Sequence, residues 1–526
     1  MIDRIDTSNP AAGSQKGEDL AQRTLCGIFW TFSGTGVRVV LETVVLVVLA
    51  RLLAPMEFGI VTAAITVIRF SEIVAYCGVE PAIVQRPAIE ARHLQTGFTF
   101  SCITGITMAC LVYLLAPQIA GFLRIVELGS ILPILALIFP IRSISLVAES
   151  LLQREVKFRI LARIDVLSYS LGYGIVGVSL AFTGFGVWSL VAANLSQAVL
   201  KTILLLRSQP HPKRMRIEPK AFKELIYFGG GFIAGRICNS LAGQGDYLVV
   251  ARWLGAASLG VYQRAYQLMA MPANFFGMAL DKVLFPVMAK LQNNPSQLKK
   301  AYRAGVMLIA LLVLPISAIM YHLAAEIISV LLGDQWLEVV VPFRILALGM
   351  LFRTSYKMSD SLARATGSVY RRAWRQGIYA ALVFCGAWVG QFWGVAGVAY
   401  GIFWAIFVNF LLMAQLSLKI TSMTWREFIS AHMPASILAL IVWFVISGSA
   451  SMLRHVEMSK MSIIAIPLLG VLITLFLLFR YMPKRILGEE AIHICSQLAS
   501  RATSNLNFLK ISRDRHTGSE GLANVK

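Results

Sequence analysis

The segment Leu49-Ala-Arg-Leu-Leu-Ala-Pro-Met-Glu-Phe-Gly-Ile60 recurs later in the chain as Val250-Ala-Arg-Trp-Leu-Gly-Ala-Ala-Ser-Leu-Gly-Val261. The two copies keep one offset, and the identical pairs are Ala50/Ala251, Arg51/Arg252, Leu53/Leu254 and Gly59/Gly260. Each copy joins two long apolar stretches. An internal repeat inside apolar sequence predicts a membrane protein with two similar halves.

Working outward from the repeat, the sequence contains many stretches long enough to cross a bilayer, which takes about 20 residues in a helix. We place about fourteen such spans near 27–49, 58–80, 96–116, 128–151, 162–182, 185–206, 225–250, 259–280, 304–324, 339–362, 374–391, 394–417, 430–450 and 461–480. The spans that follow the two copies are expected to cross the membrane in the same direction, as in a parallel repeat. We therefore predict an all-α polytopic membrane protein, with two six-helix lobes around a central cavity and two extra C-terminal helices.

The domain organisation follows from the spans and from the polar segments between them. The stretch between Arg207 and Lys223 is basic and contains Pro210, Pro212 and Pro219, so it is the best linker between the lobes. The predicted parts are a cytoplasmic N-terminal segment at 1–24, an N-lobe at 25–206, a basic cytoplasmic linker at 207–224, a C-lobe at 225–418, helices 13 and 14 at 419–480, and a polar basic cytoplasmic tail at 481–526.

The composition excludes several classes of protein. The chain of 526 residues is 57% hydrophobic and 14% charged, whereas soluble domains are about 45–50% apolar and about 25% charged. The mean hydropathy of +0.70 also excludes intrinsic disorder, which needs low hydrophobicity. A typical soluble enzyme is therefore excluded.

The formal net charge of +21 would suggest nucleic-acid binding in a soluble protein. Here most Lys and Arg of the connections fall in alternate loops, on the side of the N-terminus, such as the loops holding Arg154–Arg163 and Lys282–Arg303. This asymmetry is what the positive-inside rule describes. We therefore expect a multi-pass membrane protein with both termini cytoplasmic, and no nucleic-acid partner.

Some basic residues lie inside the spans, where each costs about 2.5–3.5 kcal/mol on insertion scales and usually faces a bundle interior. They are Arg38, Arg69, Arg142, Lys201, Arg236, Arg264, Arg344, Arg353 and Lys357. Local neutralisation is one interpretation, because carboxylates stand three or four residues away in the pairs Arg38/Glu42, Arg69/Glu72 and Lys357/Asp360. The other interpretation is a cationic cavity, since Arg236, Arg264, Arg344 and Arg353 have no such neighbour.

The chain lacks the GxxxxGK[ST] loop of ATPases and any paired Cys/His set for a metal. We therefore expect no cofactor, no metal and no enzymatic activity. We also expect an ion gradient to be the source of energy for transport. Carboxylates inside or near the spans are the candidates for ion coupling, namely Glu42, Asp246, Asp360, Asp165 and Glu149. The alternative is that they only neutralise neighbouring arginines.

Six short motifs together resemble those of a known family. In chain order they are Ala50–Gly59, Gly78–Arg86, Leu151–Arg159, Gly184–Trp188, Tyr262–Tyr266 and Val283–Gln292. The chain resembles a Wzx-type flippase of the polysaccharide transporter family, within the MOP exporter superfamily. The resemblance implies two lobes around a cationic cavity. It also implies the translocation of an undecaprenyl-pyrophosphate-linked oligosaccharide across the bacterial inner membrane, for exopolysaccharide, capsule or lipopolysaccharide O-antigen synthesis.

The buried arginines suit such a cargo, because a guanidinium presents a fork that matches phosphate oxygens. We expect the pyrophosphate to bind Arg38, Arg236 and Arg264, with Arg69, Arg353 and Lys357 as second choices. The expected partners are the lipid-linked oligosaccharide and membrane lipids. Whether a polysaccharide polymerase and a chain-length regulator act with the protein stays open at this point.

Three other functions remain open. A multidrug or metabolite antiporter of the same superfamily would favour an acidic cavity, whereas these spans hold more basic than acidic residues. A polysaccharide polymerase or glycosyltransferase usually needs a large periplasmic loop, and the predicted topology has none. A receptor or scaffold would not need so many charges within its spans.

Overall fold

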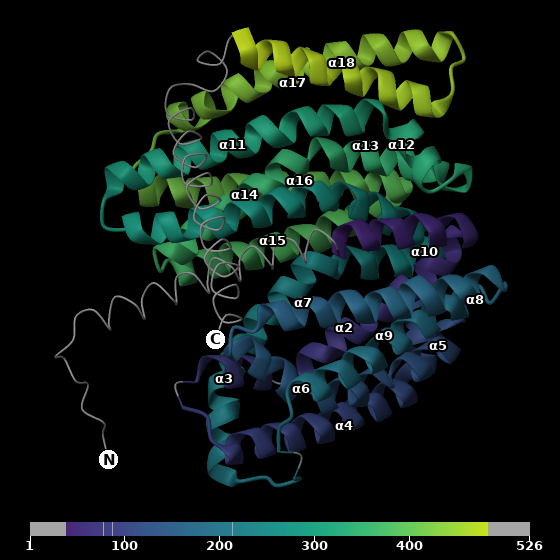
Figure 1. The fold of residues 1–526 in the computed structure, drawn as a ribbon, viewed down its shortest axis with the longest axis vertical. Coiled ribbons are helices and arrows are strands. Elements are labelled where there is room, and N and C mark those ends of the chain that lie inside the picture. Colours follow the sequence, from purple (N-terminus) through teal and green to yellow (C-terminus); the bar gives the residue numbers. More distant parts are fainter. Residues whose placement is uncertain (1–37, 77, 87, 213, 482–526) are drawn as a thin grey trace, which may run out of the picture. The chain divides into compact units, whose positions relative to one another are not determined.

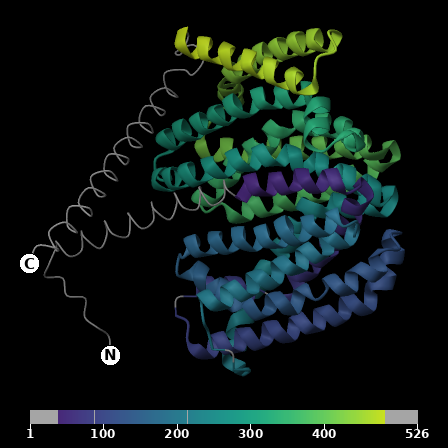
Figure 2. The ribbon, with the colours of Figure 1, turned by 45° about the vertical axis from the view of Figure 1, so that its right-hand side comes forward.

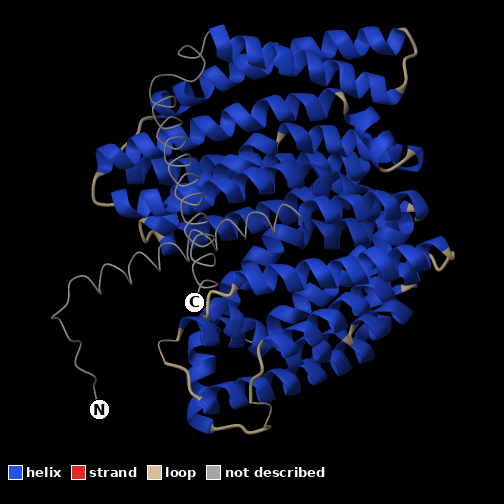
Figure 3. Ribbon diagram, viewed as in Figure 1, coloured by secondary structure: helices blue, strands red, loops and turns tan. Residues whose placement is uncertain are grey.

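The computed structural model describes residues 38–76, 78–86, 88–212 and 214–481, although the side chains at 225–236, 238, 279, 282, 283, 369 and 479 are not described. Within these residues the chain is helical, and no strand occurs among them (Figure 3). The predicted N-terminal segment at 1–24 and nearly all of the tail at 481–526 lie outside the described residues. The predicted all-α fold class is confirmed.

The helices follow one another with short connections (Figure 1). The first described helix covers 38–52. The others are α2 (Pro55–Ala75), α3 (Val79–Gln85), α4 (Ala91–Leu123), α5 (Leu128–Leu135), α6 (Ile138–Arg154), α7 (Phe158–Tyr169), η1 (Ser170–Gly177), α8 (Val178–Phe182), α9 (Val187–Ser208), α10 (Pro219–Leu291), α11 (Pro295–His322), α12 (Ala324–Leu331), η2 (Asp334–Val339), α13 (Val340–Leu348), α14 (Met350–Ala365), α15 (Val369–Gly390), η3 (Gln391–Trp393), α16 (Gly394–Thr421), α17 (Trp425–His455) and α18 (Lys460–Tyr481).

The predicted spans coincide with these helices. In the described part, 9 helices are long and apolar enough to cross a membrane, or 10 if a pair bent by 44° between Leu348 and Met350 is one span. One of them, Tyr370–Thr421, contains two predicted spans. Two further predicted spans lie in α10, and the first lies partly in the helix at 38–52. Each predicted span therefore overlaps a helix, and the chain is a multi-pass membrane protein.

Local sequence explains where several helices begin or break. Asn294 caps α11 by accepting a hydrogen bond from the Gln297 N–H (3.2 Å). Thr424 and Glu427 form a reciprocal capping box at the start of α17. Gly255 divides α10 between its two predicted spans with φ 85° and ψ 177°, a conformation that only glycine adopts without strain.

The described chain divides into two compact units. Among the residues that the structure describes, the first comprises those up to Met271 together with Ile328–Leu346 and Ala373–Ala405, and the second comprises Pro272–Ile327, Ala347–Arg372 and those from Ile406 onward. Within the second unit α17 packs against both α11 and α18, as the two views show (Figures 1 and 2). The predicted lobe boundaries at 206 and 225 stay a prediction.

The two copies of the sequence repeat touch each other within the first unit. A Cβ placed on Gly59 would lie 1.7 Å from the carbonyl oxygen of Ala256, and one on Gly260 would lie 2.0 Å from that of Pro55. These two contacts are related by the offset of the repeat, so equivalent positions exchange equivalent contacts. The absence of both side chains is what lets the backbones approach this closely.

A second glycine contact joins α15 to α16 in the same unit. A Cβ on Gly390 would lie 2.4 Å from the Gly397 carbonyl oxygen, and one on Gly401 would lie 2.1 Å from that of Gly386. Both helices therefore carry glycines four residues apart at one antiparallel crossing.

Side chains also tie the start of α10 to α3 and α4. The carboxylate of Glu224 accepts a hydrogen bond from Arg86 (2.6 Å) and contacts the ring of His93 (3.1 Å). The hydrogen bond from Arg86, and then that from His93, lowers the pKa of Glu224. Arg92 pairs with Glu218 (3.1 Å). This anchor fixes the segment that leads into the cavity-lining part of α10.

Candidate functional site

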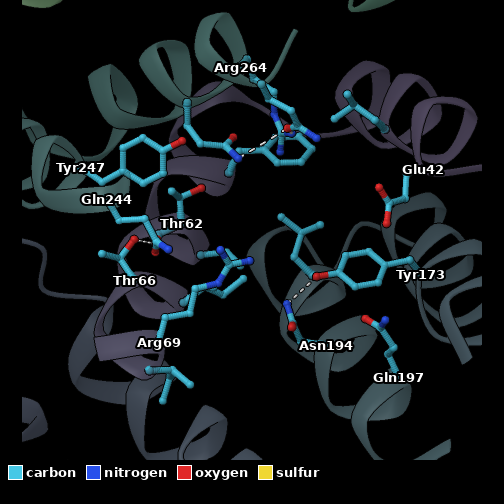
Figure 4. Close-up of a pocket in the computed structure, with 18 of the residues that line it drawn as sticks. Glu42, Thr62, Thr66, Arg69, Tyr173, Asn194, Gln197, Gln244, Tyr247 and Arg264 are labelled. Atoms are coloured by element: carbon cyan, nitrogen blue, oxygen red, sulfur yellow. Dashed lines mark hydrogen bonds between the residues drawn. The ribbon is translucent and has the colours of Figure 1, made fainter. Parts of the chain in front are cut away.

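A polar cavity of about 530 Å³ lies in the first unit. Its walls come from the helix at 38–52, α2, α6, α7 with η1, α9 and α10 (Figure 4). Four arginines and two glutamates line it, so its formal charge is positive by two. The arginines are Arg38, Arg69, Arg142 and Arg264. A basic cavity inside a membrane protein is suited to an anionic ligand.

Arg69 extends from α2 into this cavity (Figure 4). The predicted pair with Glu72 is wrong, because Glu72 instead binds Arg142 of α6. Tertiary packing thus gives the carboxylate a different arginine from the one in its own helix. Within the described part of the chain, Arg69 forms no ion pair or hydrogen bond, so its guanidinium is available to a ligand.

Arg264 enters the cavity from α10 and is 7% exposed. Its guanidinium lies 4.1 Å from the centre of the Phe58 ring, which is a cation–π contact, and it donates to Gln267. Phe58 in turn packs edge-on against Trp336, with ring centres 5.4 Å apart. No carboxylate among the described residues pairs with Arg264, so its charge is held in place but not neutralised.

Arg38 is already neutralised. It donates to Glu42 at 2.7 Å and lies 3.4 Å from Asp165 of α7. The predicted pair of Arg38 and Glu42 is confirmed. Arg38 is therefore less available to a ligand than Arg69 or Arg264, although it lines the same cavity.

A second cavity of about 300 Å³ adjoins this ion pair in the same unit. There Lys201 of α9 bridges Glu149 (2.8 Å) and Asp165 (3.1 Å). Arg38 and Arg142 line both cavities. Three of the predicted ion-coupling carboxylates, Glu42, Asp165 and Glu149, thus belong to one network of alternating charges.

Lys201→Met is expected to lower the free energy of unfolding by about 1–3 kcal/mol, because it leaves two carboxylates without their ammonium partner in a membrane-embedded cavity. The measurement is thermal unfolding of the purified protein in detergent. Lys201→Arg keeps the charge, so its free energy of unfolding should fall by less. Lys220→Met, at an exposed position, is the matched control, and equal stability of both methionine variants would contradict this role for Lys201.

The remaining predicted residues are placed elsewhere. Asp246 is 2% exposed and accepts a hydrogen bond from the Tyr262 hydroxyl (2.6 Å), and it is not among the residues that line the cavity. The side chain of Arg236 lies outside those described. Arg353, Lys357 and Asp360 belong to the second unit.

In that second unit the predicted pair of Lys357 and Asp360 is wrong. Lys357 donates to the side-chain oxygen of Asn274 (2.7 Å). Asp360 binds Arg364 (3.1 Å) and Arg372 instead. Arg364 stands four residues from Asp360 in α14, whereas Arg372 belongs to α15, so the same helix and a neighbouring helix each supply a partner to this carboxylate.

Sequence reasoning missed the uncharged polar side chains of the cavity. The principal ones are Tyr169, Tyr173, Asn194, Gln197, Gln244 and Gln267. The available signal was the presence of asparagine and glutamine inside apolar spans, where an amide needs a polar environment.

The comparisons with known proteins agree with this geometry. The sequence model of a family described as "Polysaccharide biosynthesis protein" matches residues 48–341, which is more than half of the chain. The teichuronic acid biosynthesis protein TuaB of Bacillus subtilis is 26% identical over 88% of this chain and 97% of its own length. The lipopolysaccharide biosynthesis protein WzxC of Escherichia coli is 24% identical over 78% of this chain and 84% of its own.

Solved structures show the same fold. The lipid II flippase MurJ, in an inward closed conformation, matches with a TM-score of 0.69 over 85% of this chain and 98% of that chain, at 15% identity. An inward-facing multidrug resistance MATE transporter of the MOP superfamily matches with a TM-score of 0.58 over 73% of this chain and 94% of that chain, at 16% identity. Together with the family match across residues 48–341, these findings confirm the resemblance in the motifs, and the chain belongs to the polysaccharide biosynthesis protein family of membrane transporters.

Proposed function

We propose that the protein is a flippase that moves an undecaprenyl-pyrophosphate-linked oligosaccharide across the bacterial inner membrane, with both termini cytoplasmic. The carrying observation is that Arg69 and Arg264 face one cavity without a carboxylate partner among the described residues. A pyrophosphate has the charge and the oxygen geometry that two such guanidiniums bind. Family membership supports a substrate that belongs to polysaccharide synthesis. The fold supports transport by alternating access, in which the cavity opens first to one side of the membrane and then to the other.

A flipping assay tests this function. Proteoliposomes containing the full chain receive a fluorescent undecaprenyl-pyrophosphate oligosaccharide, and its exposure to an external quencher is followed over time. The expected result is flipping faster than in protein-free vesicles, with inhibition by inorganic pyrophosphate. Export of a cationic dye without movement of the lipid would favour the alternative multidrug antiporter, which the positive cavity disfavours.

For the source of energy, we propose that the network of Glu42, Asp165 and Glu149 responds to an ion gradient. Two cations, Arg38 and Lys201, are shared among these three carboxylates, which leaves one negative charge in excess. A carboxylate left without a cation in a low-dielectric environment favours the binding of a proton or another positive ion. A polysaccharide polymerase and a chain-length regulator act after the flippase in this proposal, because both need the exported repeat.

A further inference from the structure

One wall of the main cavity has an unusual backbone. Residues Ser170–Gly177, with the sequence SLGYGIVG, form a π-helical segment between α7 and α8. Such segments are rare and often occur at functional sites, because the wider turn redirects side chains. This segment contributes Tyr173 to the cavity, where it faces Asn194 and Gln197 of α9 (Figure 4).

Close packing holds this wall in place against α9. A Cβ on Gly172 would lie 2.7 Å from the Gln197 backbone nitrogen, and one on Gly177 would lie 2.9 Å from the Ala193 Cβ. The π-helical segment therefore packs closely against α9 at two points, against the backbone at Gln197 and against the Cβ of Ala193. A wall of this kind holds its side chains with little freedom, which favours selective binding.

The polar groups of the wall are joined to one another. The amide nitrogen of Asn194 donates to the Tyr173 hydroxyl (2.5 Å). The Tyr173 ring is stacked on that of Tyr169, with centres 5.0 Å apart and planes 15° apart. After this hydrogen bond the tyrosine O–H proton and the asparagine carbonyl oxygen still have hydrogen-bonding capacity, and Gln197 adds a second amide.

This combination matches the chemistry of a sugar. A pyranose has faces of C–H groups that pack on aromatic rings, and a rim of hydroxyl or acetamido groups that exchange hydrogen bonds with amides. Tyr169, Tyr173, Asn194 and Gln197 carry no charge. They are therefore suited to an uncharged sugar, whereas the arginines of the same cavity are suited to the phosphates.

We infer that Tyr169, Tyr173, Asn194 and Gln197 form a subsite for the first, uncharged sugar next to the pyrophosphate, so that this wall sets the glycan specificity. The inference rests on the proposed function, because Arg69 and Arg264 bind the pyrophosphate in it. A volume of about 530 Å³ is in the range that holds a drug-sized ligand. The subsite therefore holds the sugar nearest to the lipid rather than the whole repeat.

Binding of two probes tests the subsite. The first is undecaprenyl pyrophosphate without sugar, and the second is undecaprenyl pyrophosphate bearing one N-acetylhexosamine. Affinities are measured on the full chain in nanodiscs. We expect Asn194→Ala and Tyr173→Leu each to weaken binding of the sugar-bearing probe by about 3- to 10-fold, the loss of about one hydrogen bond or stacking contact. Affinity for the bare probe should change by less than about 2-fold.

Tyr173→Phe separates stacking from hydrogen bonding, since it keeps the ring and removes only the hydroxyl. Tyr173→Phe should therefore lose less affinity for the sugar-bearing probe than Tyr173→Leu does. Gln197→Ala serves as a second test if Tyr173→Leu does not fold, and Arg207→Ala, at an exposed position, is the control expected to bind both probes like the wild type.

The outcomes separate the two proposals. If the wild type binds neither probe, the proposed function fails. If the wild type binds both probes but Asn194→Ala, Gln197→Ala and the Tyr173 variants affect both alike, or neither, the wall has only a structural role and the sugar subsite is wrong.

Discussion

Replacing Arg69 by glutamine is expected to weaken binding of undecaprenyl pyrophosphate by about 10- to 100-fold. Arg69 faces the cavity and has no ion-pair or hydrogen-bond partner among the described residues, so its guanidinium does not have to leave an acid to reach the phosphate. A hydrogen bond to a charged group contributes about 1.5–3 kcal/mol, and 1.4 kcal/mol corresponds to a factor of ten. Glutamine keeps hydrogen-bonding capacity and similar bulk but removes the charge.

The measurement is the affinity for this probe in nanodiscs, together with flipping in proteoliposomes. Arg69→Lys should recover part of the loss, because lysine restores the charge without the planar fork. Arg207→Gln is the matched control at an exposed position. Normal affinity of Arg69→Gln, with normal unfolding temperature, would show that the pyrophosphate does not bind this arginine.

The crossing of the two repeat copies is the second sensitive point. Gly59→Ala is expected to lower the free energy of unfolding by about 1–3 kcal/mol or more, because its Cβ would lie 1.7 Å from the Ala256 carbonyl oxygen and overpacking costs this much when the backbone has to move. The helices that would be displaced carry Phe58 and Arg264, which line the cavity. Transport should therefore fall together with stability.

The same substitution elsewhere provides the control. A Cβ on Gly121 of α4 would meet nothing within 4 Å, so Gly121→Ala should leave the unfolding temperature in detergent unchanged or slightly higher. Gly260→Ala should resemble Gly59→Ala, because the two positions make reciprocal contacts with Pro55 and Ala256. Full stability of either glycine variant at this crossing would contradict the close contact.

The arrangement of the spans was predictable because it depends on local properties. A run of apolar residues determines where a helix crosses the membrane, whatever its neighbours are. The repeat around Gly59 and Gly260 could also be found in the sequence, although not the fact that its two copies touch. The π-helical wall at Ser170–Gly177 was not predicted, because the same apolar, glycine-containing sequence is compatible with an ordinary α-helix.

Pairing of the charges was predicted only in part. Arg38 and Glu42 do pair at one turn's separation, as sequence distance suggested. Glu72, however, stands three residues from Arg69 in α2 and binds Arg142 of α6, and Asp360 binds Arg364 of its own helix and Arg372 of α15 rather than Lys357. Sequence distance gives the candidate partners within one helix but does not choose between Lys357 and Arg364 for Asp360, and an arginine from a neighbouring helix competes for the same carboxylate.

The sequence alone determined that this protein is a helical membrane transporter with basic residues inside its spans, since hydropathy, charge asymmetry and the repeat are properties of the chain itself. Only the tertiary structure decided which basic residues keep an available charge. Arg69 and Arg264 lack an acidic partner among the described residues, whereas Arg38 and Arg142 are paired. The physical reason is that neutralisation depends on distances between side chains from different helices, and these distances exist only after the helices have packed.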